Sequence, residues 1–568
     1  MNAKSAISSL PASTRCITIP ELRWIIIDLV QEINTLMALA LTCKSFSGPA
    51  LDILWRHLDG FERLIKCLPQ SLWKRDKNKL EFQRTMTLDD WAIFCKYNYR
   101  VRSLVHRCHV PSYIHTEMVC GTEIWRALSC PPFSLPLLPN LTFLTWTKAS
   151  DETFQYIQLF VTSQLTELDI QFSGLRYDPS FTFGPPQQSI LSSIAKSCPS
   201  LSYFDFQEEY SSTTSVGDTS TVLQFWSHLT WVRVGIVSEA AILHLSDLPS
   251  LEVLTFTLPS VLISADTQKL LQRPVFRALQ ELDVTCKSLV NLATFLEKIT
   301  IAPAVLSFTT TRGVDFAQAL PDLISRLSNA CTHSSLQELQ LNIRVDHQLA
   351  DPDASIEAAS FQPLFAFRNL LDFGLKVDSL CVVRMDDASL LQMAKAWPIL
   401  ENLSITGYSR SSHQVTPHAF VLLLWHCPRL ISVGIPVNWS VIEMHPIPRE
   451  IPYQGFSHKA LSHSVFGGSK ISDPISIAAF ISAIAPNLKS IVGDDDYLRD
   501  DDNHQGWEMV QNLVTTLPII REQGMRVMHG IIQAPCSYGY RRGSAAGGPT
   551  MKKPVLVVML VLPGRWRK

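Results

Sequence analysis

The sequence predicts an α/β repeat solenoid that follows a small three-helix module. Three observations predict this fold class. A unit of the form Leu-x-x-Leu-x-apolar recurs from residue 139 onward, a Pro-x-Leu signal marks the start of many units, and residues 19–60 show helical patterning without the unit. The chain has 568 residues, of which 46% are hydrophobic and 18% charged, so it can bury a large core, and a mostly disordered chain is excluded.

The repeated unit alternates apolar and polar residues, as a half-buried strand does. Its starts lie at Leu141, Leu165, Leu201, Leu229, Leu251, Leu279, Leu336, Leu370, Leu400 and Leu430, with a weaker unit at Leu488 and weak copies near Leu306 and Leu461. Successive units therefore give the strands of a repeat array.

Amphipathic stretches such as residues 190–197 and 418–425 precede several units, and a proline separates them from the strand, as at Pro199 and Pro428. Proline disfavours helix in the residue before it, so it ends the helix and the strand follows. A helix–stop–strand unit with a period of about 28 residues is typical of leucine-rich repeats.

The spacing of the units is irregular, and the Asn or Cys that usually follows the strand is absent. Ser173 and Arg344 stand at that position in two units. We therefore expect a degenerate solenoid without the usual ladder of asparagines. A set of unrelated β–α units in ordinary α/β domains is the alternative.

Residues 19–60 predict three short helices. Pro20 suits the first turn of a helix, where its missing N–H is not needed. Ile25 and Leu29 share one face of the first helix, and Leu36 and Leu39 share one face of the second. A core of this size gains stability by docking on another part of the chain or on a partner.

Several segments of this module resemble the F-box family: Ile19-Pro20-Glu21-Leu22, the aliphatic residues up to Val30, Leu39-Ala40-Leu41-Thr42-Cys43-Lys44-Ser45-Phe46, and Leu54-Trp55. The family pattern has a Leu-Pro-x-Glu-Leu-like opening and a Leu-x-x-Val-Cys-x-x-Trp-like middle. This sequence departs from it in having Pro directly before Glu, Thr before Cys43, and Phe46 in place of the usual Trp. A plain helical cap on the solenoid is the alternative.

An F-box-like module followed by leucine-rich repeats resembles the F-box/leucine-rich-repeat proteins that are expanded in fungi. That resemblance implies a substrate-recognition subunit of an SCF-type cullin–RING E3 ubiquitin ligase, which is not itself an enzyme. The module would bind the Skp adaptor, and through it the cullin and RING subunits, while the repeats would bind an unknown protein substrate. The adaptor-binding residues implied by the motif are Pro20, Leu22, Ile25, Leu29, Leu36, Leu39, Cys43 and Phe46. The alternative function is a non-ligase leucine-rich-repeat scaffold or interaction protein.

Several acidic residues fall between the apolar positions of the predicted strands. In a solenoid such positions face the concave surface, which is the usual recognition surface. The candidate recognition residues are Glu167, Asp169, Asp205, Glu281, Asp283 and Glu338, which predict a mildly acidic groove. The alternative is that these polar residues only keep the sheet soluble.

The predicted organisation has five parts. Residues 1–18 form a flexible leader, 19–60 the F-box-like module, 61–138 a helical connector, 139–523 the irregular solenoid, and 524–568 a disordered tail. The tail is Gly-rich and basic, with eight Lys or Arg and no Asp or Glu, whereas the whole chain has a net charge of −2. The overall balance disfavours a nucleic-acid partner.

No sequence motif predicts catalysis, and we expect no cofactor and no metal. P-loop, G-x-S-x-G and H-E-x-x-H patterns are absent from the sequence, and His106 and Cys108 lack a second ligand pair at zinc-finger spacing. The longest purely apolar run, residues 555–562, is too short to cross a membrane. The scattered, odd number of cysteines, 13, predicts a cytoplasmic or nuclear protein.

Overall fold

The structure is a computed structural model of the whole chain. It describes residues 19–108, 118–149, 151–172, 184–207, 216–313, 316–345, 355–377, 382–407, 415–443, 452–467, 469–493 and 501–533. The predicted leader, residues 1–18, and the tail beyond residue 533 lie outside the described residues. Two compact units divide the chain, residues 1–516 and 517–568.

A parallel sheet of 15 strands runs through the first unit. In spatial order the strands are β1 (His57–Asp59), β4 (Ser103–Arg107), β6 (Phe143–Ala149), β7 (Glu167–Phe172), β8 (Tyr203–Gln207), β9 (Trp231–Ile236), β10 (Val253–Thr257), β11 (Glu281–Cys286), β12 (Val305–Gly313), β13 (Glu338–Val345), β15 (Asp372–Val377), β17 (Asn402–Gly407), β18 (Ser432–Gly434), β19 (His463–Val465) and β20 (Ser490–Val492). The spatial order follows the chain order, so each turn of the chain packs on the one before it.

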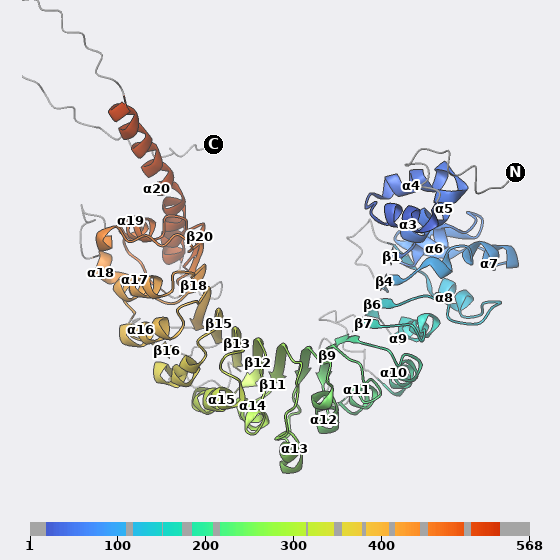
Figure 1. Ribbon diagram of the computed structural model, residues 1–568, viewed down its shortest axis with the longest axis horizontal. Coiled ribbons are helices and arrows are strands. Elements are labelled where there is room, and N and C mark those ends of the chain that lie inside the picture. The colour runs from blue at the N-terminus through green and yellow to red at the C-terminus, as the bar shows by residue number, and fades with distance from the viewer. Residues whose placement is uncertain are drawn as a thin grey trace, which may run out of the picture. The chain divides into compact units, whose positions relative to one another are not determined.

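Most helices connect successive strands and form a second layer along one side of the sheet (Figure 1). The first three described helices precede the first strand, and the last one follows the last strand. The described helices are α3 (Pro20–Asp28), α4 (Ile33–Thr42), α5 (Lys44–Leu54), α6 (Glu62–Lys66), α7 (Leu88–Phe94), α8 (Thr122–Leu128), α9 (Asp151–Phe154), α10 (Pro185–Ser197), α11 (Val216–Leu223), α12 (Glu239–Asp247), α13 (Ala265–Leu270), α14 (Leu289–Leu296), α15 (Phe316–Ala330), α16 (Asp387–Ala396), α17 (Pro417–His426), α18 (Ser440–Glu443), α19 (Pro474–Ile484) and α20 (Asp501–Gln533), with the 3-10 helices η1 (Asn98–Arg100), η2 (Gln155–Phe160), η3 (Ala358–Ala366) and η4 (Pro452–Gly455).

Two small sheets lie outside the main one. One contains β2 (Trp73–Asp76), β3 (Lys79–Phe82) and β5 (Val119–Cys120), and the other pairs β14 (Ser355–Glu357) with β16 (Val382–Arg384). The predicted α/β repeat solenoid with N-terminal helices is therefore confirmed. All the predicted repeat units, including the weak ones, supply a strand to the main sheet.

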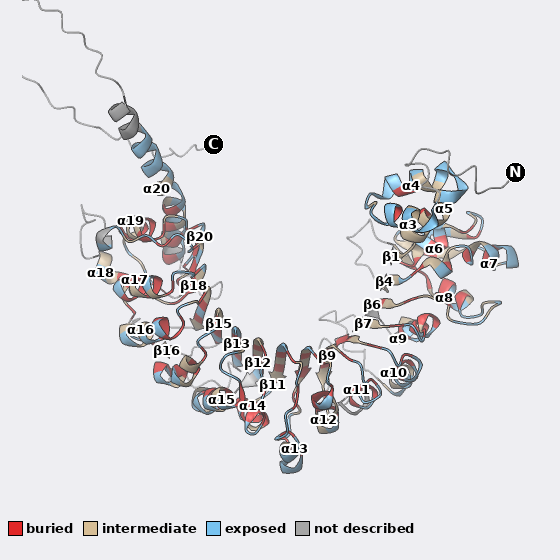
Figure 2. Cartoon of the chain, in the orientation of Figure 1, coloured by how far each residue is buried: buried red, intermediate tan, exposed pale blue. Residues whose placement is uncertain are grey.

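The second apolar position of each unit builds the core. Leu144, Leu168 and Phe204 are neighbours across β6, β7 and β8, and Leu282 and Leu339 continue the same buried row further along the sheet. Figure 2 shows the buried residues between the strand layer and the helices. Because each side chain packs on the equivalent one in the next turn, the apolar unit in the sequence becomes a continuous core.

A ladder of backbone hydrogen bonds joins the turns where each strand begins. The carbonyl of Thr142 accepts N–H groups from Thr166 and Glu167, and the carbonyl of Thr166 accepts those of Ser202 and Tyr203. The hydroxyl groups of Thr166 and Ser202 donate to the same carbonyls, at 3.1 and 3.2 Å. This strand-start ladder joins successive turns at the edge where the chain enters the sheet.

The structure corrects the predicted helical connector, residues 61–138. The main sheet already begins with β1 just before it, and β4 inside it belongs to the same sheet. Val101, Leu104 and His106 occupy the three inward positions of a repeat unit, and all three are buried. The unit was not visible in the sequence because histidine stands where an apolar residue is expected.

The predicted start of the tail is also corrected. Helix α20 continues through Gly524 to Gln533, so residues 524–533 are helical rather than disordered. Glu522 and Arg526, one helical turn apart on either side of Gly524, form a salt bridge of 2.6 Å that stabilises the helix there.

His106 is expected to make folding stability fall as the pH falls from 6.5 towards 3. Its ring lies 5.0 Å from that of Trp125 and 4.6 Å from that of Trp146, and burial lowers its pKa to about 3. Within this window the unfolded chain binds a proton at this residue that the folded chain does not, so lowering the pH favours unfolding. Within this window each pH unit lowers the free energy of unfolding by about 1.4 kcal/mol.

Urea unfolding of the wild type and of His106→Phe, at about pH 7.5 and about pH 5.5, measures this contribution. The wild type should lose more stability than the variant between the two pH values. His57→Gln, at an exposed position of β1, is the control and should behave as the wild type does. An equal loss in His106→Phe would contradict the assignment.

Candidate functional site

The three N-terminal helices bury few of their many apolar side chains. Ile27, Leu36 and Ala50 form the buried core of the module. Half-buried side chains pack around this core: Val30, Leu39, Ala40, Phe46, Ile53 and Leu54. Pro20 occupies the first turn of α3 and Glu21 follows it, so the helix starts with the residues that favour an N-terminus.

Each of α3 and α4 keeps one apolar stripe exposed. On α3 the stripe follows the helical period, with residues at i, i+3, i+4 and i+7, and on α4 it follows i, i+4 and i+8. The stripes are Leu22, Ile25 and Ile26 on α3 with its C-cap residue Leu29, and Ile33, Met37 and Leu41 on α4. We call these seven residues the apolar stripes. Leu29 is 76% exposed and Leu41 is 86% exposed, so neither helix is covered there by the described part of the chain.

The predicted adaptor-binding residues divide between the surface and the core. Pro20, Leu22, Ile25, Leu29 and Cys43 are exposed. The hydrogen bond between the Cys43 thiol and the Ser45 hydroxyl, at 2.9 Å, lowers the pKa of that thiol. The first-helix part of the prediction thus falls on one exposed stripe, and whether these residues bind an adaptor remains a prediction.

The structure corrects the expectation that Leu36 is a docking residue on the surface. Leu36 is 3% exposed, and Leu39 and Phe46 are half-buried against the same core. The docking residues predicted on α4 lie on its inward face, and the outward face carries Ile33, Met37 and Leu41 instead. Helix α4 carries apolar residues on both faces, and only its packing on α5 decides which face is inward.

The six predicted recognition carboxylates come together in two rows across the main sheet. Strand pairing places Glu167, Glu281 and Glu338 in one row and Asp169, Asp205 and Asp283 in the next, two residues further along each strand. Strand register places all six on the side of the sheet that faces away from the core, where five are exposed or half-buried and Asp205 is only 3% exposed. We call this side the strand face.

Further residues of the same rows were missed in the sequence. Asp372 continues the first row, which also contains Tyr203 and Trp231, with rings stacked 4.1 Å apart. Arg233 stands in the second row, 3.6 Å from Asp205 and 4.9 Å from the centre of the Trp231 ring. These residues occupy the same two outward positions of their strands, so an alignment of the repeat units at those positions would have identified them.

The strand face from β7 to β15 is acidic. Its two rows hold seven carboxylates and one guanidinium, that of Arg233. Partial burial raises the pKa of Asp169 and Asp283, and it raises the pKa of Glu338 together with the charges of Asp372 and Glu281. A cation nearby would stabilise the ionised form of carboxylates that are crowded in this way.

Among the residues that the structure describes, no group of three or more His, Cys, Asp and Glu side chains could hold a metal ion. No helix in the described ranges is long and apolar enough to cross a membrane.

No protein-family description matches the sequence, and no curated protein matches it. Among solved structures, the chain is similar to a chain of the yeast Rad7 and Elc1 complex, with 12% sequence identity and a TM-score of 0.23. The match covers 55% of this chain and 90% of that chain. A similarity at this TM-score supports no argument about function, so the assignment of the fold rests on the strand order and register described above.

Proposed function

We propose that this chain is the substrate-recognition subunit of an SCF-type cullin–RING E3 ubiquitin ligase. In this proposal the apolar stripes of α3 and α4 bind the Skp adaptor, which connects the chain to the cullin and RING subunits. The strand face binds the protein substrate. The ubiquitin-transfer chemistry belongs to the other subunits, and this chain contributes only binding.

The observation that carries the proposal is the exposed apolar surface of the F-box-like module. Small helices that expose seven large apolar side chains mark a protein–protein interface, because such surface is costly to leave in water. The stripe on α3 coincides with residues that the F-box resemblance implies, namely Leu22, Ile25 and Leu29. A helical cap that only closed the solenoid would turn its apolar stripes towards the sheet.

The negative charge of the strand face favours a protein substrate that carries a basic segment. Lysine and arginine side chains of such a segment would offset the crowded carboxylates of the two rows. Complementary charge of this kind mainly speeds the encounter and selects the partner. The rows span several turns, which suits an extended stretch of substrate lying across the strands.

Charged substitutions in the α3 stripe test adaptor binding. We expect the full chain to form a soluble one-to-one complex with the Skp adaptor, and Ile25→Asp combined with Leu29→Asp to abolish it. Burying each aliphatic side chain contributes about 1.5–3 kcal/mol. Losing both should weaken the complex by a factor of about 100 or more, as measured by calorimetry or size-exclusion chromatography.

The matched control is Val261→Asp combined with Leu262→Asp, which changes two exposed aliphatic side chains elsewhere in the chain. This variant should bind the adaptor as the wild type does. Unchanged binding by the α3 variant would show that the stripe on α3 is not the docking surface. If the wild-type chain is folded but does not bind the adaptor, the result would instead favour the non-ligase scaffold function.

A further inference from the structure

An arginine-rich cavity lies between the N-terminal helices and the first turns of the sheet. It has a volume of about 490 Å³ and is lined by Trp24, Asp52, Arg56, Tyr99, Arg100, Arg102 and Asn140. Trp24 comes from α3, Asp52 from α5, and Tyr99 and Arg100 from η1. A cavity of this size is in the usual range for small-molecule sites.

The cavity carries a positive charge. Arg100 pairs with Asp52 and also donates to the carbonyl of Gly48 at 3.1 Å. Arg56 pairs with Asp28, at 2.9 Å. Arg102 has no carboxylate partner among the residues that the structure describes, and the one hydrogen bond of its side chain there is a long one, 3.4 Å, to the carbonyl of Asn140.

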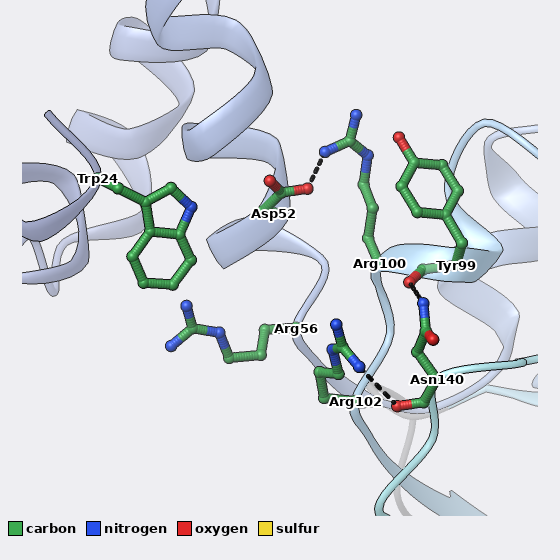
Figure 3. Close-up of a pocket in the computed structure, with 7 residues that line it drawn as sticks. All are labelled: Trp24, Asp52, Arg56, Tyr99, Arg100, Arg102 and Asn140. Atoms are coloured by element: carbon green, nitrogen blue, oxygen red, sulfur yellow. Dashed lines mark hydrogen bonds and ion pairs between the residues drawn. The ribbon is translucent and has the colours of Figure 1, made fainter. Parts of the chain in front are cut away.

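Aromatic rings hold two of the three guanidinium groups in place. The guanidinium carbon of Arg56 lies 5.0 Å from the centre of the Trp24 ring, and that of Arg100 lies 4.9 Å from the centre of the Tyr99 ring. Figure 3 shows the guanidinium groups around one space, with Trp24 on one side and Tyr99 on the other. A ligand therefore meets two arginines, Arg56 and Arg100, that are already ordered, which lowers the entropy lost on binding.

The available donors suit a phosphoryl group. The Nη2 groups of Arg100 and Arg102 make no hydrogen bond to the described residues, so both remain free to donate. The planar fork of arginine matches the oxygens of a phosphate and forms strong, charge-assisted hydrogen bonds with them. An inorganic phosphate would fill only part of the cavity, which leaves room for an organic group beside Trp24 and Tyr99.

We propose that this cavity binds a small phosphate monoester. Its phosphoryl group accepts hydrogen bonds from Arg102 and Arg100, with Arg56 adding positive charge, and its organic part lies against the aromatic side chains. The bound ligand joins α3 and α5 to the first turns of the sheet. The site does not depend on ligase function, because a scaffold with the same fold would have it too.

Isothermal titration of the full chain, without any adaptor, tests the site with three phosphate probes, inorganic phosphate, glycerol 3-phosphate and adenosine monophosphate, and with adenosine as the phosphate-free control. We expect both monoesters to bind more tightly than inorganic phosphate, and adenosine without phosphate not to bind. Arg102→Gln should weaken monoester binding about tenfold or more, since it removes hydrogen bonds to a charged group. Arg102→Lys, which keeps the charge but loses the fork, should bind with intermediate affinity.

Arg126→Gln on α8 is the matched control, because Arg126 is exposed and does not line the cavity. Its affinity should stay within about twofold of the wild type, well below the loss expected for a direct hydrogen bond. The proposal is overturned if no probe binds, if inorganic phosphate binds as tightly as the monoesters, or if Arg102→Gln and Arg126→Gln weaken binding equally. None of these results bears on the adaptor experiment, which uses a different surface.

Discussion

Replacing Trp125 with alanine is expected to destabilise the first turns of the solenoid by about 3–5 kcal/mol, the usual cost of removing a large buried aromatic side chain. Trp125 is 1% exposed and lies at the centre of a cluster of rings. Its ring centre is 5.2 Å from that of Phe61, 5.7 Å from that of Trp146 and 6.0 Å from that of Phe160. Phe61 belongs to the turn before that of Trp125, and Trp146 and Phe160 belong to the turn after it, so one substitution loosens contacts on both sides.

Hydrogen exchange with the native chain measures this effect, since the loss should be local. Amides from β1 to β7 should exchange faster in Trp125→Ala, whereas those from β13 onward should keep their protection, because each turn contacts only its neighbours. Trp425→Ala is the control: Trp425 is 62% exposed, and its removal should cost less than about 1 kcal/mol. A uniform loss of protection along the whole sheet would contradict the local effect.

Replacing Leu36 with alanine is expected to open the N-terminal module while the solenoid stays folded. Leu36 supplies much of a core that otherwise contains Ile27 and Ala50 as fully buried residues. A buried leucine-to-alanine change costs about 2–5 kcal/mol, which is large for so small a core. Adaptor binding should then fall because the helices unfold, although Leu36 itself is not on the surface.

Leu41→Ala provides a closely matched control, because Leu41 lies on the same helix and is 86% exposed. Amides of residues 20–54 should lose hydrogen-exchange protection in Leu36→Ala and keep it in Leu41→Ala. Equal protection in the two variants would show that Leu36 is not a core residue. Weaker adaptor binding by Leu41→Ala with full protection would support the α4 part of the proposed docking surface.

The strands of the main sheet could be predicted because their inward positions are almost all apolar and follow a period of two. The two missed strands break this rule. β1 has only three residues with one buried side chain, Leu58, and β4 has His106 at an inward position. A pattern built on apolar residues cannot find a strand whose core position is a neutral, buried imidazole.

The candidate sites were predictable to different degrees. The acidic rows of the strand face followed from the alignment of the units, because parallel strands in register bring equivalent positions together. The outward face of α4 could not be predicted, since Ile33 and Leu36 are both aliphatic and lie on different faces. The arginine-rich cavity joins residues from Trp24 to Asn140, which only the packing of the module on the first turns brings together.

The strand-start ladder also bears on how such a chain changes length in evolution. Each rung uses the backbone carbonyl of one turn and the N–H groups of the next, with side chains such as Thr166 adding to it but not replacing it. A duplicated or deleted turn would find the same donors and acceptors on its new neighbours, whatever its side chains. Units of unequal spacing already share one unbroken ladder, from the carbonyl of Arg56 to the N–H groups of Lys489 and Ser490, so turns of different length fit without changing it.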